Sequence, residues 1–276
     1  MIENYFLNVL FLLIVFIVTQ SYGSFLGKFF FKQYNLNIAE IGFIGFFSLL
    51  IISLSIHFFL PLSIMVNSII ILFGILIFFY LNRSLFLDYL KFFLPLILLI
   101  SILSISIEYH SDYFWYHLPY INTLNQYKII FGSSNINDFF GYGHGWLDIM
   151  ALFTLPKFDN IFSTFISIIF VSYYIYYLIE KFYSSNSEIL KVLCLLSLIF
   201  FFLQYPLIKD YGAEIQINLL YILLFLNIFS FQKNLENRDK IFTIIVFLII
   251  FLFFLRLNSI IFLPLIILFF IYNLKY

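Results

Sequence analysis

An almost unbroken apolar run occupies residues 41–60, IGFIGFFSLLIISLSIHFFL, and a second one follows Pro61 at residues 62–81, LSIMVNSIIILFGILIFFYL. A helix needs about 20 apolar residues to cross the hydrocarbon core of a bilayer. Lipid offers the backbone no hydrogen-bond partners, so a helix, which satisfies its own backbone, is the economical way across. The two runs therefore predict a pair of transmembrane helices.

The composition of the whole chain supports the same class. Of the 276 residues, 64% are hydrophobic and 10% are charged, whereas soluble proteins carry about 25% charged residues. A soluble core could not bury this much Phe and Ile, so the bilayer is the expected solvent. The formal net charge is zero, which gives no reason to expect a nucleic-acid partner. A single cysteine, Cys194, excludes an intrachain disulfide and a cysteine-based metal cluster.

Similar apolar runs recur along the chain. The sequence predicts about nine spans, at roughly residues 5–22, 41–60, 62–81, 92–107, 160–179, 190–207, 215–231, 241–255 and 258–274. The first run has no basic region before it and no small-residue cleavage site after it, so we expect a retained span rather than a signal peptide. The predicted fold is therefore all-α, a polytopic transmembrane bundle in a single domain over residues 1–276.

Lysine and arginine are distributed unequally between alternate connections. One side receives Lys28, Lys32, Arg83, Lys91, Lys181, Lys191, Lys233, Arg238, Lys240 and Lys275. The other side receives only Lys128, Lys157, Lys209 and Arg256. Because cytoplasmic loops carry the excess of basic residues, we expect the first side to be cytoplasmic. The segment 108–159 would then face outward, together with 208–214 and the turn at 254–259.

The outward segment holds most of the polar and aromatic variety of the chain. Residues 108–146, EYHSDYFWYHLPYINTLNQYKIIFGSSNINDFFGYGHGW, contain three of the four histidines, both tryptophans and four of the ten glycines. Within them, the amphipathic stretch LPYINTLNQYKIIF predicts an interfacial helix on the membrane surface. We therefore expect the chemistry of this protein to lie in the outer loop.

Asp112 is the carboxylate placed best for catalysis, because it follows the fourth span directly. A carboxylate at that depth can be partly desolvated, which suits a general base. Tyr116 lies four residues further on and would share a helix face with it. Two alternatives stay open for Asp112: a helix N-cap or a solvated loop carboxylate.

The histidines raise the question of a metal site. His110, His117 and His144 lie in the loop, but neither HExxH nor a comparable zinc spacing occurs. We predict no metal ligands among them, and a divalent cation is left open as a cofactor. The histidines would instead anchor the loop at the interface or contact substrate.

Aromatic and basic residues supply further candidate contacts. Glycine alternates with larger residues up to Trp146, and such aromatics could stack on a sugar or lipid headgroup, or form an interfacial belt. Lys209 and Arg256 could bind a lipid phosphate if they point into a cleft. Alternatively, Lys209 and Asp210 only solvate a loop, and Arg256 snorkels to the interface.

The motif of the outer loop consists of Asp112, Tyr116-His117-Leu118-Pro119, Gly132, Asn135, Gly141-Tyr142 and Trp146. An acidic residue at the start of a large outer loop, followed by interfacial helices, resembles the GT-C class. These polytopic glycosyltransferases take sugars from polyprenyl-phosphate carriers. The motif is also similar to a group of bacterial multispanning proteins that are often found with surface-polysaccharide genes.

The resemblance implies roles for individual residues. Asp112 would activate the acceptor or bind a metal, and Lys209 and Arg256 would hold the donor phosphate. The further substrate contacts that we infer are Tyr116, His117, Asn135, His144, Trp146 and Asp210.

The expected function is transfer of a sugar from a polyprenyl-phosphate-linked donor to a glycan, lipid or protein at the outer face of a bacterial inner membrane. The lipid bilayer is the other expected partner. Three spans precede the fourth span, which leads into the outer loop, where many members of the class have one. The alternatives are a transporter, flippase-like or scaffold component of surface-polysaccharide assembly, or a fragment of a longer enzyme.

Overall fold

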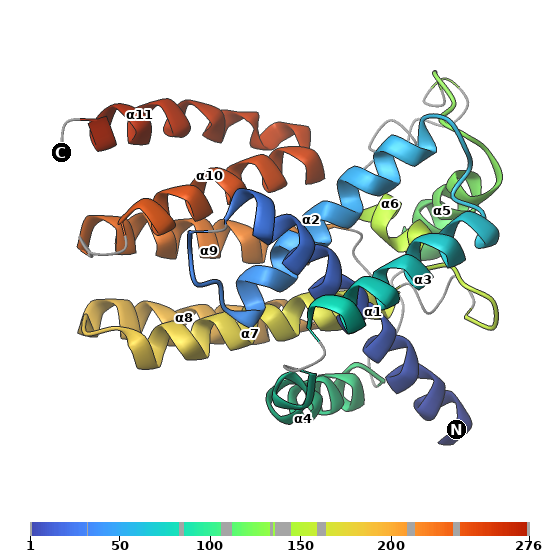
Figure 1. Cartoon of the computed structure of the whole chain (residues 1–276), viewed down its shortest axis with the longest axis horizontal. Coiled ribbons are helices and arrows are strands. Elements are labelled where there is room, and N and C mark those ends of the chain that lie inside the picture. Colours follow the sequence, from blue (N-terminus) through green and yellow to red (C-terminus); the bar gives the residue numbers. More distant parts are fainter. Residues whose placement is uncertain are drawn as a thin grey trace. The chain divides into compact units, whose positions relative to one another are not determined.

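The computed structural model describes residues 2–31, 33–82, 86–105, 112–132, 135, 145–158, 164–208, 213–233 and 238–274. Within these ranges the chain is all-helical, as the sequence predicted, apart from an isolated bridge between Leu155 and Phe158. The helices are α1 (Ile2–Phe30), α2 (Ile38–His57), α3 (Ile64–Leu81), α4 (Phe86–Ile105), η2 (Tyr113–His117), α5 (Leu118–Gln126), α6 (Gly145–Leu152), α7 (Ile166–Ser184), α8 (Glu188–Gln204), η6 (Tyr205–Ile208), α9 (Glu214–Lys233), α10 (Arg238–Leu255), η7 (Leu257–Phe262) and α11 (Leu263–Leu274) (Figure 1).

Each predicted span coincides with helical structure, but fewer helices meet the requirements for crossing a membrane. Among the described residues, four are long and apolar enough: Tyr5–Phe30, Ile38–His57, Ile64–Leu81 and Glu214–Phe231. The others fall short for physical reasons. The helix α8 has 17 residues, and α10 begins with three charged residues, Arg238, Asp239 and Lys240. A membrane protein is therefore indicated, and the count of nine spans is not supported.

The helices are divided between two compact units. The N-terminal unit comprises Met1–Tyr177 and Pro206–Gly212, and the C-terminal unit comprises Leu178–Tyr205 and Ala213–Tyr276. The long helix α7 belongs to the first unit up to Tyr177 and continues into the second. The single transmembrane domain stays a prediction.

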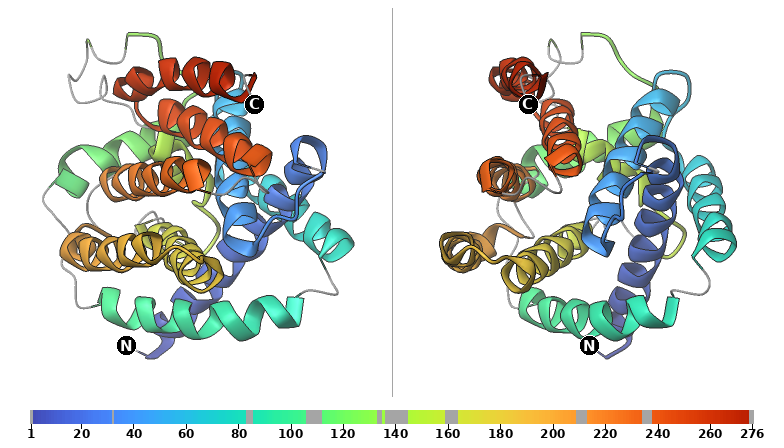
Figure 2. Two further views of the ribbon diagram at one scale, coloured as in Figure 1. Left: turned by 90° about the vertical axis from the view of Figure 1, so that its left-hand side faces the viewer. Right: turned by 60° about the vertical axis from the view of Figure 1, so that its left-hand side comes forward.

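In the N-terminal unit, α1 and α2 approach each other closely because glycines lie at their contact. The two helices are side by side in Figures 1 and 2. A Cβ atom at Gly23 would meet the backbone of Ile41, and one at Gly45 would meet the backbone of Thr19. Only glycine permits backbones to approach this closely, as in many membrane helix pairs.

A tyrosine from α7 completes the core of this unit. The ring of Tyr173 lies against Gly42, and its hydroxyl forms a 2.7 Å hydrogen bond with the hydroxyl of Thr19. Phe46 and Phe93 pack around the same ring, with centroids 6.1 and 5.3 Å away. Because the tyrosine hydroxyl has a partner, this polar group is buried without the cost of an unmade hydrogen bond.

The segment after Asp112 docks on the ends of α2 and α3 that lie near Pro61. The amide of Leu62 donates to the carbonyl of Leu124 at 3.0 Å, and the amide of Ile129 donates to the carbonyl of His57 at 3.1 Å. The fully buried Asn67 side chain, in the first turn of α3, donates to the carbonyls of Ala151 and Thr154 at 2.8 and 3.2 Å. These bonds hold α5 and α6 against one end of the helix pair.

In the C-terminal unit, the helices α8, α9, α10 and α11 follow one another as a row, each beside the next (Figure 2). The hydroxyl groups of Tyr221 in α9 and Ser259 in η7 form a 2.8 Å hydrogen bond. The Tyr221 ring also packs on Phe262, with centroids 5.3 Å apart. These contacts fix the connection between α10 and α11 over α9.

Candidate functional site

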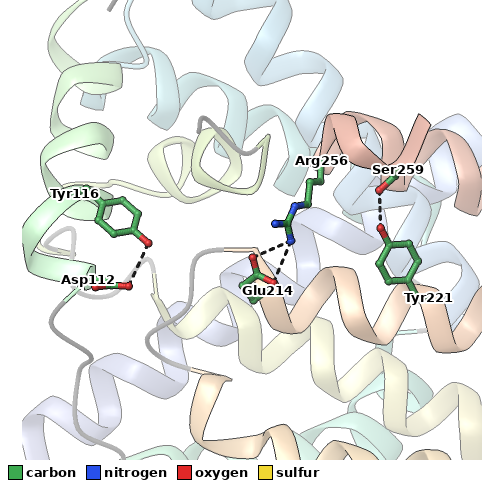
Figure 3. Close-up of polar contacts among 6 residues, drawn as sticks. All are labelled: Asp112, Tyr116, Glu214, Tyr221, Arg256 and Ser259. Atoms are coloured by element: carbon green, nitrogen blue, oxygen red, sulfur yellow. Dashed lines mark hydrogen bonds and ion pairs between the residues drawn. The ribbon is translucent and has the colours of Figure 1, made fainter. Parts of the chain in front are cut away.

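Asp112 begins the helical segment that continues through η2 into α5. Its side chain is half-exposed, and the hydroxyl of Tyr116 donates a hydrogen bond to Oδ2 at 3.4 Å (Figure 3). The bond confirms that the two side chains share one face of the segment. Asp112 occupies the N-cap position of η2 but makes no side-chain capping bond there. Its carboxylate is therefore not used to cap this helix.

The turn after Asp112 is a π-helix, Tyr113–His117, in which the amide of Leu118 bonds to the carbonyl of Tyr113. Such turns are rare and frequently lie at functional sites. His117 ends the turn with its side chain buried, and its ring packs edge-on to Tyr116 at 4.2 Å. The predicted contact residue His117 therefore supports Tyr116 from within the protein.

A second set of polar side chains comes from three helices, α6, α2 and α5. Asp148 in α6 is buried, and its Oδ1 atom is 3.8 Å from Nδ1 of His57 at the end of α2. Burial raises the pKa of Asp148 from 3.8 to about 7. Tyr120, four residues after Tyr116, is close enough to feel this carboxylate: burial and the Asp148 charge together raise its pKa to about 12.

A hydrogen bond of the His57 ring determines which of its nitrogen atoms carries the hydrogen and which faces Asp148. Its Nε2 atom lies 3.1 Å from the carbonyl oxygen of Tyr127. A carbonyl can only accept, so Nε2 must carry the hydrogen, and Nδ1 of a neutral ring then presents a lone pair to Asp148. The distance of 3.8 Å between Nδ1 and Oδ1 is longer than a hydrogen bond. Asp148 and His57 are therefore buried ionisable neighbours, and a proton on either facing atom would favour their contact.

Neither residue of this pair was predicted to be functional from the sequence. Asp148 lies just beyond residues 108–146, and His57 lies within the apolar run 41–60. A signal was present, since ionisable side chains in or beside a membrane span are rare and often functional. Their contact could not be predicted, because the two residues lie far apart in the sequence and meet only through the docking of α6.

Trp146 lies in the core of the N-terminal unit. Its side chain is fully buried, and the centroids of Phe46 and Phe170 are each 5.4 Å from its ring. This position gives Trp146 a packing role between α6 and α2. Asn135 is exposed in a turn, where its backbone amide donates to the carbonyl of Gly132 at 2.9 Å.

The remaining predicted contacts are placed only in part. His144, Lys209 and Asp210 lie outside the described residues. Among the residues that the structure describes, no group of three or more His, Cys, Asp or Glu could hold a metal ion. The divalent cation that the sequence left open therefore has no ready cluster of ligands in those ranges.

Arg256 in the C-terminal unit forms an ion pair with Glu214 at the start of α9. Its Nη1 atom lies 3.0 and 3.2 Å from the two carboxylate oxygens (Figure 3). Both side chains are about one-third exposed, at 36% and 37%. Arg256 is thus held by a partner rather than simply snorkelling, and a guanidinium has donors left for an anion. Its convergence with Asp112 and Lys209 stays a prediction.

The described helices, with their apolar surfaces and few charges, define a helical protein of the membrane-spanning class. The chain belongs to a family described as a domain of unknown function (DUF8201), whose model matches residues 6–276. No curated protein and no solved structure matches the chain. The resemblance to the GT-C class therefore rests on the sequence motif around Asp112.

Proposed function

We propose that this protein is a membrane glycosyltransferase that transfers a sugar from a polyprenyl-phosphate-linked donor to a glycan, lipid or protein acceptor. The observation that supports it is the half-exposed Asp112 carboxylate, which Tyr116 orients and which makes no capping bond. A general base must reach the proton that it removes and must keep a fixed direction. Asp112 meets both conditions at the start of the candidate outer segment.

The proposed reaction is an inverting displacement at the anomeric carbon. The acceptor hydroxyl oxygen forms the new bond to that carbon while Asp112 takes the hydroxyl proton. The bond between the anomeric carbon and the donor phosphate oxygen breaks, and polyprenyl phosphate leaves with the electron pair. Arg256 and Lys209 would stabilise the negative charge that develops on the leaving phosphate.

The membrane arrangement forms part of the same proposal. The excess of basic residues on one set of connections supports an orientation with the Asp112 segment at the outer face, and the proposed membrane is a bacterial inner membrane. The count of about nine spans belongs here as well, with α4, α7, α8, α10 and α11 added to the four long apolar helices. The proposed site would then lie at the boundary where a lipid-linked donor presents its sugar.

The test replaces Asp112 by Asn in a null strain complemented with the gene, followed by measurement of surface glycan and of sugar transfer in isolated membranes. Loss of a general base lowers the rate by about 10²- to 10⁴-fold. Glu188→Gln is the control, because Glu188 is an exposed carboxylate paired with Lys191 at 2.8 Å. Full recovery of the glycan by Asp112→Asn, with normal protein levels, would rule out a catalytic role for Asp112.

The buried pair of His57 and Asp148 favours a second candidate, a proton-coupled transporter of lipid-linked glycans. Ionisable groups beside a span commonly mark proton or substrate pathways. Flux into proteoliposomes separates the two candidates. The enzyme yields a donor-dependent product without substrate movement, whereas a transporter moves the intact lipid-linked glycan and forms no new glycosidic bond.

A further inference from the structure

A cavity of about 330 Å³ lies in the N-terminal unit, at the place where α1 and α3 end and α2 begins. Gly23, Gly27 and Lys28 of α1 line it, together with Leu36 before α2 and Asn82 after α3. It lies at the opposite end of α2 from His57, and so away from the proposed site. Cavities of about 300 to 1,000 Å³ are typical of small-ligand sites.

Gly27 leaves space on the α1 side of the cavity. Gly23 lies one turn earlier and packs against the backbone of Ile41 in α2, so it closes the cavity on that side. A Cβ atom at Gly27 would come within 3.3 Å of Cδ1 of Leu36, so even a methyl group narrows the opening. A larger side chain at position 27 would fill the cavity without removing any polar group.

The polar part of the lining is already paired. The Nδ2 atom of Asn82 donates to Oγ of Ser24 at 2.9 Å, and both side chains are buried. This bond links the end of α3 to α1 and closes the base of the cavity. Tyr34 also lines the cavity, and its hydroxyl accepts a 2.6 Å hydrogen bond from Nε2 of Gln33. The apolar part of the wall includes Phe31 and Leu81.

Lys28 supplies the charge at the rim. It is exposed in the last turn of α1, and no carboxylate among the described residues forms an ion pair with it. In the sequence, Lys32 and Arg83 occur in the two connections that flank the cavity. Basic residues therefore dominate this end of the helix bundle, which the charge distribution predicts to be cytoplasmic.

The cavity also adjoins an apolar surface. Phe29 and Phe30, on the last turn of α1, are 69% and 70% exposed, and they end the candidate span Tyr5–Phe30. A ligand at this position would meet the Lys28 cation on one side and exposed aromatic rings on the other. Such a combination suits an amphiphile with an anionic head.

We propose that this cavity binds the phosphate headgroup of an anionic lipid, with the phosphate on Lys28 and the lipid backbone against the wall formed by Gly27, Phe31 and Leu81. Basic pockets between membrane helices on the cytoplasmic side recognise anionic headgroups in this way. A phosphatidylglycerol of the bilayer and a polyprenyl phosphate share the required chemistry. The inference goes beyond the proposed function, since it concerns another end of the unit and needs no transfer activity.

The experiment measures lipid retention by native mass spectrometry of the full chain in detergent. Phosphatidylglycerol, the zwitterionic phosphatidylcholine and a polyprenyl monophosphate are added separately. The variants are Lys28→Gln and Gly27→Leu, and Lys191→Gln is the matched control on a basic residue that is paired elsewhere. One lysine near a membrane surface contributes about a fivefold change in anionic-lipid binding.

We expect Lys28→Gln to lower phosphatidylglycerol binding about fivefold, Gly27→Leu to abolish the strongest binding event, and Lys191→Gln to leave it unchanged. Equal losses for Lys28→Gln and Lys191→Gln would overturn the proposal, because they indicate general surface charge. Wild-type binding by Gly27→Leu or tight phosphatidylcholine binding would also overturn it. Displacement of phosphatidylglycerol by polyprenyl monophosphate identifies the carrier as the ligand, and its failure identifies the bilayer phospholipid. If Gly27→Leu does not fold, Lys28→Gln still tests the proposal, because Lys28 is exposed.

Discussion

Asp148 shows at the scale of one residue how burial changes what a carboxylate can do. Its neighbours in the N-terminal unit are His57 from α2 and Tyr120 from α5. Burial raises its pKa to about 7, so the folded protein binds the carboxyl proton more tightly than the unfolded chain does. A group in this state stabilises the fold while it is protonated and loses that contribution as it ionises.

The resulting prediction concerns the pH dependence of stability. The contribution of Asp148 is complete below its unfolded pKa of 3.8 and is lost as the pH rises through about 7. Asp148→Asn keeps the shape of the side chain and cannot ionise. We expect the Tm of the wild type, relative to this variant, to fall between about pH 4 and pH 7 and to level off above. Parallel Tm curves for the two proteins in detergent would contradict the buried titration, and Glu188→Gln should run parallel to the wild type.

The residues also show where sequence reasoning succeeds and where it stops. Asp112 and Tyr116 were predicted to share a face because a local spacing of four residues determines it. Trp146 was predicted as a substrate contact, yet its ring fills the core, since the docking of α6 on α2 decides its surroundings. The pair of Asp148 and His57 depends on the same docking, so neither the loop nor the apolar run could reveal it alone.

At the scale of helices, the contact between α1 and α2 depends on the absence of side chains. A Cβ atom at Gly45 would meet the backbone of Thr19, which cannot move aside without shifting a helix. A Cβ atom at Gly27, in α1, would approach only the end of the Leu36 side chain, at 3.3 Å. The two glycines therefore differ in what a methyl group would displace.

We expect Gly45→Ala to destabilise the protein by about 1 to 3 kcal/mol, the usual cost of overpacking, whereas Gly27→Ala has a much smaller effect. Thermal unfolding of the two variants in the same detergent measures the difference. A helix-propensity effect would favour alanine in both helices, so it cannot produce a loss at Gly45 alone. Equal Tm values for the two variants would show that α1 and α2 are not in backbone contact.

Helix positions were largely predictable, and helix roles were not. The ranges 41–60 and 62–81 became α2 and α3 with shifts of a few residues, because long apolar runs carry their own signal. The count of nine spans is not supported among the described residues, where length and charge leave four candidate spans. Arg238, Asp239 and Lys240 make the start of α10 unsuitable, although the run that follows is as apolar as a span.

For the whole molecule, the contact between α2 and the segment after Asp112 makes the membrane topology of the N-terminal unit testable. The candidate span α2 begins after the connection that contains Gln33 and ends at His57. The His57 ring is hydrogen-bonded to the carbonyl of Tyr127. Tyr127 and Gln33 are both exposed. If α2 crosses the bilayer, these two residues must lie on opposite faces of the membrane.

Single cysteines at these positions test the arrangement, with the buried native Cys194 replaced by Ala. The excess of basic residues near Gln33 predicts that this end lies in the cytoplasm. We therefore expect an impermeant maleimide to label Tyr127→Cys on intact cells, and Gln33→Cys only after the membrane is opened. Labelling of both on intact cells would show that α2 does not cross the bilayer. The reverse pattern would keep α2 as a span but turn Asp112 toward the cytoplasm, where an outer-face sugar transfer is impossible.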